Sequence, residues 1–443
     1  MSHLTERLGD FACALAAQPL SAEVTHHAKR AVIDWYAALL PGLIEAPATH
    51  LCSVLATELD QGPARLATGR SASARAAALI QGSASHAVEF DDIFREAIYH
   101  PGAPTISAVW ALAQALGADG ARTLRAIVAG YEISTRIGAA LGRAHYRFWH
   151  NTGTVGCFGA ASACASLLGL DATRHAHALA TVGTFAAGLQ QAFRMDSMSK
   201  PLHAGRAAES GLMAALMAQA GITGSLDIFE GEAGLGHAMS NGPDWARAMA
   251  SLGEHFNITE MTFKNHGCCG HTFAAIDGTL ALKEKLACPI ESITRVRILT
   301  YGPALDVAGN PDPLTAAQAR FSLPFVIATA LRFGSVRLAA FSEERLRDPL
   351  TRALMKRIDI GIDPELDAAF PGQRAARVQF ELSDGRCETW LQPTRKGDPD
   401  APLSDTELEA KFMELASPVV GEEQARARLA GLWSLDAATR IEA

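Results

Sequence analysis

The stretch from residue 86 to residue 104 reads His-Ala-Val-Glu-Phe-Asp-Asp-Ile-Phe-Arg-Glu-Ala-Ile-Tyr-His-Pro-Gly-Ala-Pro. The alanine-rich chain before it predicts a helix, and three carboxylates follow at its end, Glu89, Asp91 and Asp92. His100 precedes a Pro-Gly pair, and proline disfavours helix at the residue before it. Acid groups at a helix end, followed by a histidine on a turn, can supply a proton donor and a proton acceptor to one pocket. A solvated acidic helix end beside a surface loop is the alternative interpretation.

Two later stretches have the same character, a titratable group just ahead of a helix of small residues. One reads Arg-Phe-Trp-His-Asn-Thr-Gly-Thr-Val-Gly over residues 147–156, and the other reads Met-Ser-Lys-Pro-Leu-His-Ala-Gly-Arg-Ala-Ala over residues 198–208. In this order and with this separation, the three stretches resemble the MmgE/PrpD family, which includes 2-methylcitrate dehydratases, cis-aconitate decarboxylases and iminodisuccinate epimerases. The resemblance covers most of the chain, from about Val24 to the C-terminal helices. Its most specific part is the Lys200 stretch together with the Gly-Leu-Met-Ala-Ala that begins at Gly211.

Length and composition narrow the class of protein. The chain has 443 residues, more than one ordinary core holds, so two domains are expected. Hydrophobic residues make up 49% and charged residues 19%, which is typical of a globular chain with a large buried volume. The formal net charge is −8 and no basic block stands out, so nucleic acid is not an expected partner.

The sequence also bears on the compartment. Apolar runs are broken by charge or glycine well short of the ~18 residues of a membrane span, so no membrane partner is expected. The first residues, Met-Ser-His-Leu-Thr-Glu-Arg, mix acid and base and do not read as a signal peptide. Eight cysteines in no secreted-type spacing suggest reduced thiols. We therefore expect a cytoplasmic protein.

The first half of the chain predicts helices. Apolar residues recur with a period near 3.6 or small residues dominate over residues 4–17, 28–40, 123–142, 154–168, 172–188 and 206–221. Several of these segments end on glycine, as helices with a left-handed terminal residue do. Asp171 is a plausible N-cap for the segment that follows it.

The pattern changes near residue 263. Residues 293–301 are rich in β-branched side chains and predict a strand, and residues 376–391 alternate around Asp384-Gly385 and predict a hairpin. Helices are expected between them, over residues 316–331 and 343–356. After a charged, proline-rich linker, Ser404 and Glu407 form a capping box that opens a helix to about residue 416, and another helix covers 422–432.

These elements predict a mainly α fold in two domains. A large all-helical domain would comprise residues 1–265 and 403–443, and a smaller α+β lid domain, residues 266–402, would be inserted before the C-terminal helices. The resemblance implies the same layout, with the active site between the domains and a homodimer as the assembly. Two-fold dimers are also the commonest oligomers.

The candidate site residues come from the three stretches. Lys200 is either an electrostatic anchor or proton-transfer group, or an exposed loop lysine. The resemblance makes it part of the active site and makes His100 and His150 catalytic candidates. Asp91 and Asp92 would either solvate a helix end, or orient a histidine or accept a proton. The predicted substrate-binding residues are Glu89, Tyr146, Arg147, Arg194, His203, Lys264, His266 and His271.

The stretch Lys264-Asn-His-Gly-Cys-Cys-Gly-His271 could be taken for a metal site. One small cation rarely takes two adjacent cysteines, and no second half of a zinc motif follows, so no metal is predicted. The resemblance instead implies that this stretch enters the lid and lines the cleft. Cys268 could then be the second base that an epimerase needs, or it could be a small buried thiol.

Absent motifs exclude other chemistry. The sequence has no G-x-G-x-x-G that opens a helix, no P-loop, no H-E-x-x-H and no G-x-S-x-G, nor the spaced cysteines of an iron–sulfur cluster. What remains is proton abstraction next to a carboxylate, which needs acid–base residues and cations but no cofactor. We therefore predict a cofactor-independent lyase or isomerase that acts on a small di- or tricarboxylate.

Departures from the family pattern rank the reactions. In the decarboxylases of this family, the residue at Glu89 is an aspartate and the residue at Ile93 is usually a threonine. Their lid tyrosine has no counterpart near residues 308–311. These differences place a dehydratase, for example of 2-methylcitrate, slightly ahead of an epimerase of a dicarboxylate such as iminodisuccinate, and cis-aconitate decarboxylation below both. A non-catalytic or metal-binding helical protein is the alternative from another class.

Overall fold

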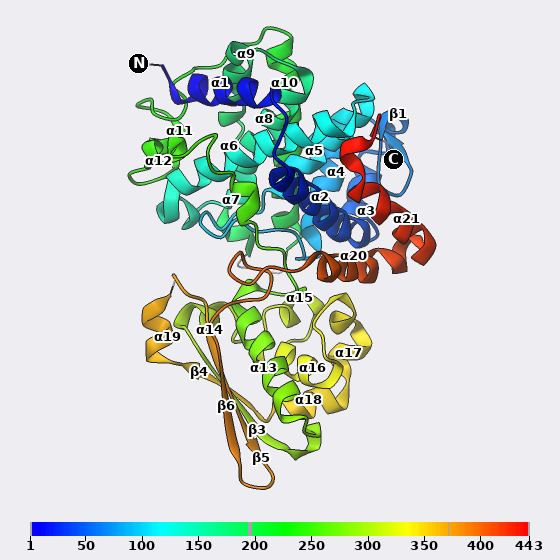
Figure 1. The fold of residues 1–443 in the computed structure, drawn as a ribbon, viewed down its shortest axis with the longest axis vertical. Coiled ribbons are helices and arrows are strands. Elements are labelled where there is room, and N and C mark those ends of the chain that lie inside the picture. The colour runs from blue at the N-terminus through cyan, green and yellow to red at the C-terminus, as the bar shows by residue number, and fades with distance from the viewer. Residues whose placement is uncertain (1, 194–196, 371, 442–443) are drawn as a thin grey trace. The chain divides into compact units, whose positions relative to one another are not determined.

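The computed structural model describes residues 2–193, 197–370 and 372–441 and divides the chain into two compact units (Figure 1). The first unit comprises Met1–Thr262 and Ser404–Ala443, and the second comprises Phe263–Leu403. The first is built of helices and the second of helices and a small sheet, which confirms the predicted fold class.

The helical unit owes its close packing to small residues. Helices α4, α5, α8 and α10 pack against one another and form its centre. A Cβ atom at Gly205 of α10 would lie 2.2 Å from the Leu79 carbonyl oxygen of α4, so only glycine allows this approach. The helices of this unit are α1 (Leu4–Ala16), α2 (Ala22–Leu43), α3 (Ala48–Val54), α4 (Ala74–Ala87), α5 (Gly102–Leu116), α6 (Gly120–Tyr146), α7 (Asn151–Thr154), α8 (Gly156–Leu168), α9 (Ala172–Gly183), α10 (Ser199–Gln219), α11 (Leu235–Met239), α12 (Trp245–Met249), α20 (Asp405–Val420) and α21 (Glu422–Trp433).

The C-terminal helices belong to this unit, and α20 lies along α2 (Figure 1). The predicted capping box of Ser404 and Glu407 opens α20. Lys411 of α20 is fully buried, and its Nζ atom donates to Asp34 Oδ1 at 2.6 Å and to the Phe90 carbonyl oxygen at 2.8 Å. Helix α20 therefore supports the chain segment that carries the candidate acids.

One feature of the helical unit was not predicted. Strands β1 (Leu59–Arg65) and β2 (Ser71–Ala72) form a short antiparallel ribbon between α3 and α4.

Among the described residues no single helix has the length and apolar composition of a membrane span; α2 and α3 meet these criteria only together, across a 69° bend.

The second unit is built on a four-stranded sheet. Its strands are β3 (Ile293–Thr300), β4 (Ile358–Ile362), β5 (Ala376–Leu382) and β6 (Cys387–Gln392), in the order β4-β3-β5-β6. The predicted hairpin is the antiparallel pair β5–β6, whereas β4 pairs in parallel with β3 and was not predicted. Alternate residues of β5, such as Val378 and Phe380, are buried in the core of this unit. Its helices are α13 (Phe273–Leu286), α14 (Gly302–Ala308), α15 (Ala316–Ala319), α16 (Leu323–Phe333), α17 (Glu343–Arg347), α18 (Pro349–Met355) and α19 (Pro364–Ala369).

Several predicted helix boundaries were wrong. The helix predicted to reach residue 188 ends at Gly183, because the following chain pairs with residues 148–150 through His150 N to Gly188 O, at 2.9 Å. The segment 316–331 breaks where the Ser322 side chain caps α16. The segment 343–356 breaks before Pro349, which begins α18.

Candidate active site

The end of α4 brings an acid back against a histidine of the same helix. His86 lies in the last turn of α4, and Glu89 follows with a φ of 60°. A residue in this left-handed conformation after a helix is usually glycine, so glutamate here costs roughly 1 kcal/mol. The reversal places Asp91 Oδ2 at 2.6 Å from His86 Nδ1, within the protein interior.

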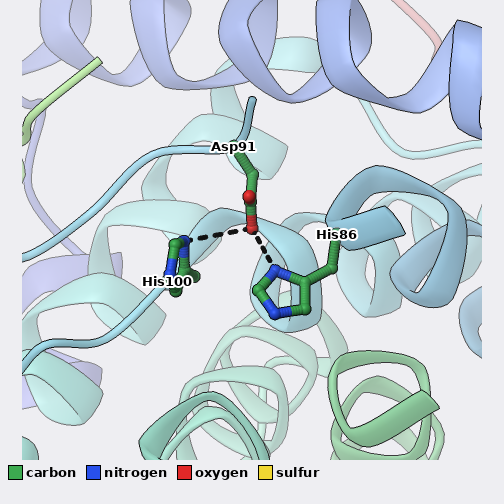
Figure 2. A group of neighbouring side chains, drawn as sticks. All are labelled: His86, Asp91 and His100. Atoms are coloured by element: carbon green, nitrogen blue, oxygen red, sulfur yellow. Dashed lines mark hydrogen bonds and ion pairs between the residues drawn. The ribbon is translucent and has the colours of Figure 1, made fainter. Parts of the chain in front are cut away.

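The same carboxylate oxygen reaches a second imidazole. Phe94 and Tyr99 pair through their backbones, with Phe94 N donating to Tyr99 O at 2.7 Å, and this closes the loop that leads to His100. His100 Nδ1 lies 3.3 Å from Asp91 Oδ2. Figure 2 shows His86 and His100 on either side of Asp91, both turned toward one oxygen.

His150 and His203 extend this group of imidazoles. The His150 ring stacks on His86, with ring centroids 5.4 Å apart and planes inclined by 28°. Its Nδ1 atom lies 3.0 Å from Nδ1 of His203, so one of the two donates and the other accepts. We name His86, Asp91, His100, His150 and His203 the imidazole cluster.

Lys200 lies in the first turn of α10, not on a loop ahead of the helix as predicted. Its Nζ atom donates to Glu89 Oε1 and lies 5.5 Å from the centre of the Phe193 ring. The Lys200 side chain is 19% exposed and that of Glu89 14%, whereas His86 is inaccessible. A small anion can therefore reach this ion pair from the solvent.

Burial keeps the deep imidazoles neutral. Desolvation lowers the pKa of His86 to about 4, against the opposing effect of Asp91 and reinforced by the charge of Lys200. Desolvation also lowers the pKa of His150 well below its ordinary value, with His86 and Lys200 as further causes. A neutral imidazole has a lone pair that can accept a proton, and the lowered pKa makes each of these rings a weaker base than a free imidazole.

Asp92 faces a different part of the helical unit from Asp91. Its Oδ1 atom accepts from the Gly102 amide at 3.0 Å, at the start of α5, and its Oδ2 atom accepts from the Tyr131 hydroxyl at 2.8 Å. Burial, followed by the charge of Asp34, raises the pKa of Asp92 to about 8. Asp92 therefore fixes the start of α5, directly after His100. The described contacts do not show it orienting a histidine, which was one of its predicted roles.

Two further predicted residues lie at the end of α6. Arg147 is exposed, and its guanidinium carbon lies 5.1 Å from the centre of the Phe148 ring, so the described contacts do not bring it to the imidazole cluster. Tyr146 is half-buried at the last residue of α6. Arg194 lies outside the described residues.

The predicted residues of the second unit form contacts of their own. His266 Nε2 lies 2.8 Å from Asp277 Oδ1. His271 Nδ1 lies 2.9 Å from the Tyr301 hydroxyl, and burial, aided by nearby arginines, lowers the pKa of His271 to about 3. Lys264 is buried as well.

The surroundings of Cys268 bear on the two interpretations of this thiol. Cys268 is fully buried, its Sγ atom lies 3.1 Å from Thr272 Oγ1, and burial raises the pKa of the thiol. A thiol that resists ionisation is a poor proton acceptor. These observations favour the small buried thiol over the second base.

Sequence reasoning missed two residues of the site. His86 is the first residue of the stretch quoted at the outset. Its position near a helix end, five residues before Asp91, could have indicated a contact between the two side chains. Tyr131 lies in the middle of α6, and no local pattern connects it with Asp92.

His86, Asp91 and His100 are also a set of donors that could hold a metal ion, with ligand atoms all within 4.8 Å of one another. Two imidazoles and one carboxylate suit several divalent transition metals. However, His86 and Asp91 are in direct hydrogen-bond contact at 2.6 Å, and the positive charge of Lys200 acts on the same group. Both features favour proton sharing over binding of a cation.

Comparisons with known proteins extend these observations. The MmgE/PrpD N-terminal domain matches residues 6–248, and the MmgE/PrpD C-terminal domain matches residues 266–436. The chain is 28% identical to a cis-aconitate decarboxylase from Homo sapiens, over 78% of this chain and 73% of the relative. It is 26% identical to a cis-aconitate decarboxylase-like protein, oryM, from Aspergillus oryzae, over 95% of this chain and 92% of the relative. The chain belongs to the MmgE/PrpD family, whose members include lyases.

Proposed function

We propose that this protein is a cofactor-independent lyase that removes a proton from the carbon α to a carboxylate of a small di- or tricarboxylate. The observation that carries the proposal is the imidazole cluster, in which burial keeps His86 and His150 neutral, beside the accessible Lys200–Glu89 ion pair. Family membership and relatives that are lyases support it.

Each part of the site has a task in this reaction. A substrate carboxylate exchanges with Glu89 for the ammonium group of Lys200, which lies at the accessible edge. His100 or His150 accepts the α proton on its free nitrogen, and the electron pair of the C–H bond moves into the adjacent carboxylate. The charge of Lys200 stabilises the enolate-like state that forms. Asp91 stabilises the imidazolium of His100.

The electron pair then returns and expels a leaving group. Dehydration is the first candidate: the β-hydroxyl leaves as water with the proton that the imidazolium of His100 or His150 returns. It is supported by Ile93, which is buried and offers no hydroxyl, and by Glu89, where the decarboxylase pattern has an aspartate.

Decarboxylation of cis-aconitate is the second candidate, because the relatives described above carry that name. In that reaction the departing CO₂ leaves its bonding electrons on the carbon chain, and a protonated imidazole of the cluster donates a proton there instead of accepting one. Epimerisation comes third. Cys268 was the only sequence feature that suggested a second base, and burial raises the pKa of this thiol.

Product identification tests the proposal. The purified protein is incubated with citrate, 2-methylcitrate, cis-aconitate and iminodisuccinate without added metal, and products are identified by NMR. A new alkene with loss of water supports the dehydratase, and itaconate with loss of CO₂ supports the decarboxylase. Absence of any product, together with stoichiometric zinc or iron in the purified protein, would instead favour the metal-binding alternative.

A further inference from the structure

His86 belongs to the imidazole cluster but has no task in the chemical steps proposed above. We propose that His86 is a positioning residue: it holds the Asp91 carboxylate in the orientation that presents one oxygen to His100. The proposal rests on the proposed function for its catalytic consequence, although the orientation itself can be measured without a substrate.

His86 makes the shorter of the two contacts described for that oxygen. The His86–Asp91 contact is 2.6 Å, whereas the His100–Asp91 contact to the same oxygen is 3.3 Å. Charge-assisted hydrogen bonds of the shorter kind are the strong ones. On this geometry the shorter bond orients the carboxylate, and His100 meets the oxygen only at ion-pair distance.

His86 also lies between the two catalytic candidates. Its ring meets His100 edge to face, with centroids 4.8 Å apart and planes inclined by 67°, and stacks on His150 at 5.4 Å. The His86 side chain is inaccessible to solvent and contacts both candidates, so we assign its effect to these neighbours rather than to contact with a substrate. The charged and titratable groups that act on it are Asp91, His100, His150 and Lys200.

The hydrogen bond also fixes the tautomer. A carboxylate accepts, so Nδ1 of His86 carries the proton and Nε2 is left with a lone pair. Nε2 is buried and has no hydrogen-bond partner among the described residues. An unpaired buried nitrogen is unusual in a ring kept only for packing, and it is consistent with a ring retained for the bond that its other nitrogen makes.

The first test uses the unmodified protein. Long-range ¹H–¹⁵N spectra of labelled histidine should show His86 protonated at Nδ1 and unprotonated at Nε2 at pH 7. A proton on Nε2 with a free Nδ1 would overturn the proposal, whether or not a substrate has been found.

The second test compares two polar variants. His86→Asn keeps an amide N–H near the position of Nδ1 and can still donate to Asp91. His86→Gln places its amide near the position of Nε2 and cannot. We expect His86→Gln to lower kcat at least about tenfold with little change in KM, as loss of an orienting residue does, and His86→Asn to stay within about threefold of the wild type.

The NMR titration of His100 supplies a readout that does not depend on turnover. In His86→Gln, Asp91 loses its stronger partner and pairs more closely with His100, so the titration midpoint of His100 should rise by at least about half a pH unit. In His86→Asn it should stay at the wild-type value. An unchanged His100 midpoint in a folded His86→Gln protein, or equal losses in both variants, would overturn the positioning role. If the wild type turns over none of the substrates, the proposed function fails while the tautomer and the midpoints still decide this inference.

Discussion

Lys200 is the cation that the proposed reaction needs, and at the scale of single residues it is the most direct target. Its Nζ atom contacts Glu89 and stays accessible to an anion. Lys200→Ala removes the charge partner of the enolate-like state, so kcat/KM should fall at least roughly a hundredfold in steady-state kinetics. The control is Lys285→Ala, because the Lys285 side chain is 53% exposed and lies 3.9 Å from Glu388. Near-wild-type turnover of folded Lys200→Ala would remove Lys200 from the site.

Asp92 should make stability depend on pH. Burial raises the pKa of Asp92 to about 8, whereas a carboxyl of the unfolded chain titrates near 4. Between these values the folded protein holds a proton that the unfolded chain has released, so the contribution of Asp92 to stability is present below pH ~4 and is lost as the pH rises to about 8.

Asp92→Asn cannot ionise and should lose this dependence. The amide still offers an acceptor to Gly102 and a donor to Tyr131. In urea unfolding between pH 5 and pH 8, the stability of the variant relative to wild type should rise with pH, by up to about 1.4 kcal/mol per unit. A difference that stays constant over this range would show that the Asp92 carboxyl is not shifted upward.

Asp91 and Asp92 show what the sequence can and cannot predict about single residues. The sequence located Asp91, His100, His150 and Lys200 as one group, and the structure brings them close together. It treated Asp91 and Asp92 alike, because adjacency in sequence does not reveal the side to which each side chain turns. The contact of Asp92 with Tyr131 joins residues 39 positions apart and leaves no local pattern.

At the scale of elements, the approach of α10 to α4 assembles the site. Gly205 of α10 contacts the backbone of α4, and this places Lys200 and His203 beside the end of α4 that carries His86. A Cβ atom at Gly205 would lie 2.1 Å from Ser83 Oγ and 2.2 Å from the Leu79 carbonyl oxygen. Gly205 is therefore required for the close packing of α10 against α4.

Gly205→Ala should force the two helices apart. We expect a loss of about 1–3 kcal/mol in the free energy of unfolding, together with reduced activity, because the Lys200–Glu89 pair spans these helices. Gly431→Ala is the matched control, since a Cβ atom at Gly431 of α21 meets nothing within 4 Å, and it should be neutral or stabilising. Equal urea midpoints for the two variants would contradict the close approach of α4 and α10.

Elements with strong local signals were predictable, and those that depend on distant partners were not. Asp384-Gly385 indicated the β5–β6 hairpin, and Ser404 with Glu407 indicated the start of α20. Strand β4 is only five residues long and is fixed by parallel pairing with β3, about sixty residues earlier in the chain. The end of α9 is likewise decided by backbone bonds to the segment before α7.

At the scale of the whole molecule, we propose a homodimer. Large apolar side chains are exposed on the helical unit, among them Phe148 at 60% and Leu189 at 55%, on segments that pair with each other. Exposed apolar groups of this kind often mark an interface. Light scattering at micromolar concentration should give about twice the chain mass of 46.8 kDa. The mass of a single chain would contradict the proposal.

If His100 or His150 takes a proton from the carbon α to a carboxylate, hydrogen–deuterium exchange at that carbon will detect the step. The protein is incubated in D₂O with each candidate acid, without added metal, and the substrates and products are followed by NMR. We expect deuterium at the α carbon with the wild type and at least about a hundredfold slower exchange with Lys200→Ala. No exchange by the folded wild-type protein, with these four acids or with a broad panel of other carboxylic acids, would contradict the claim.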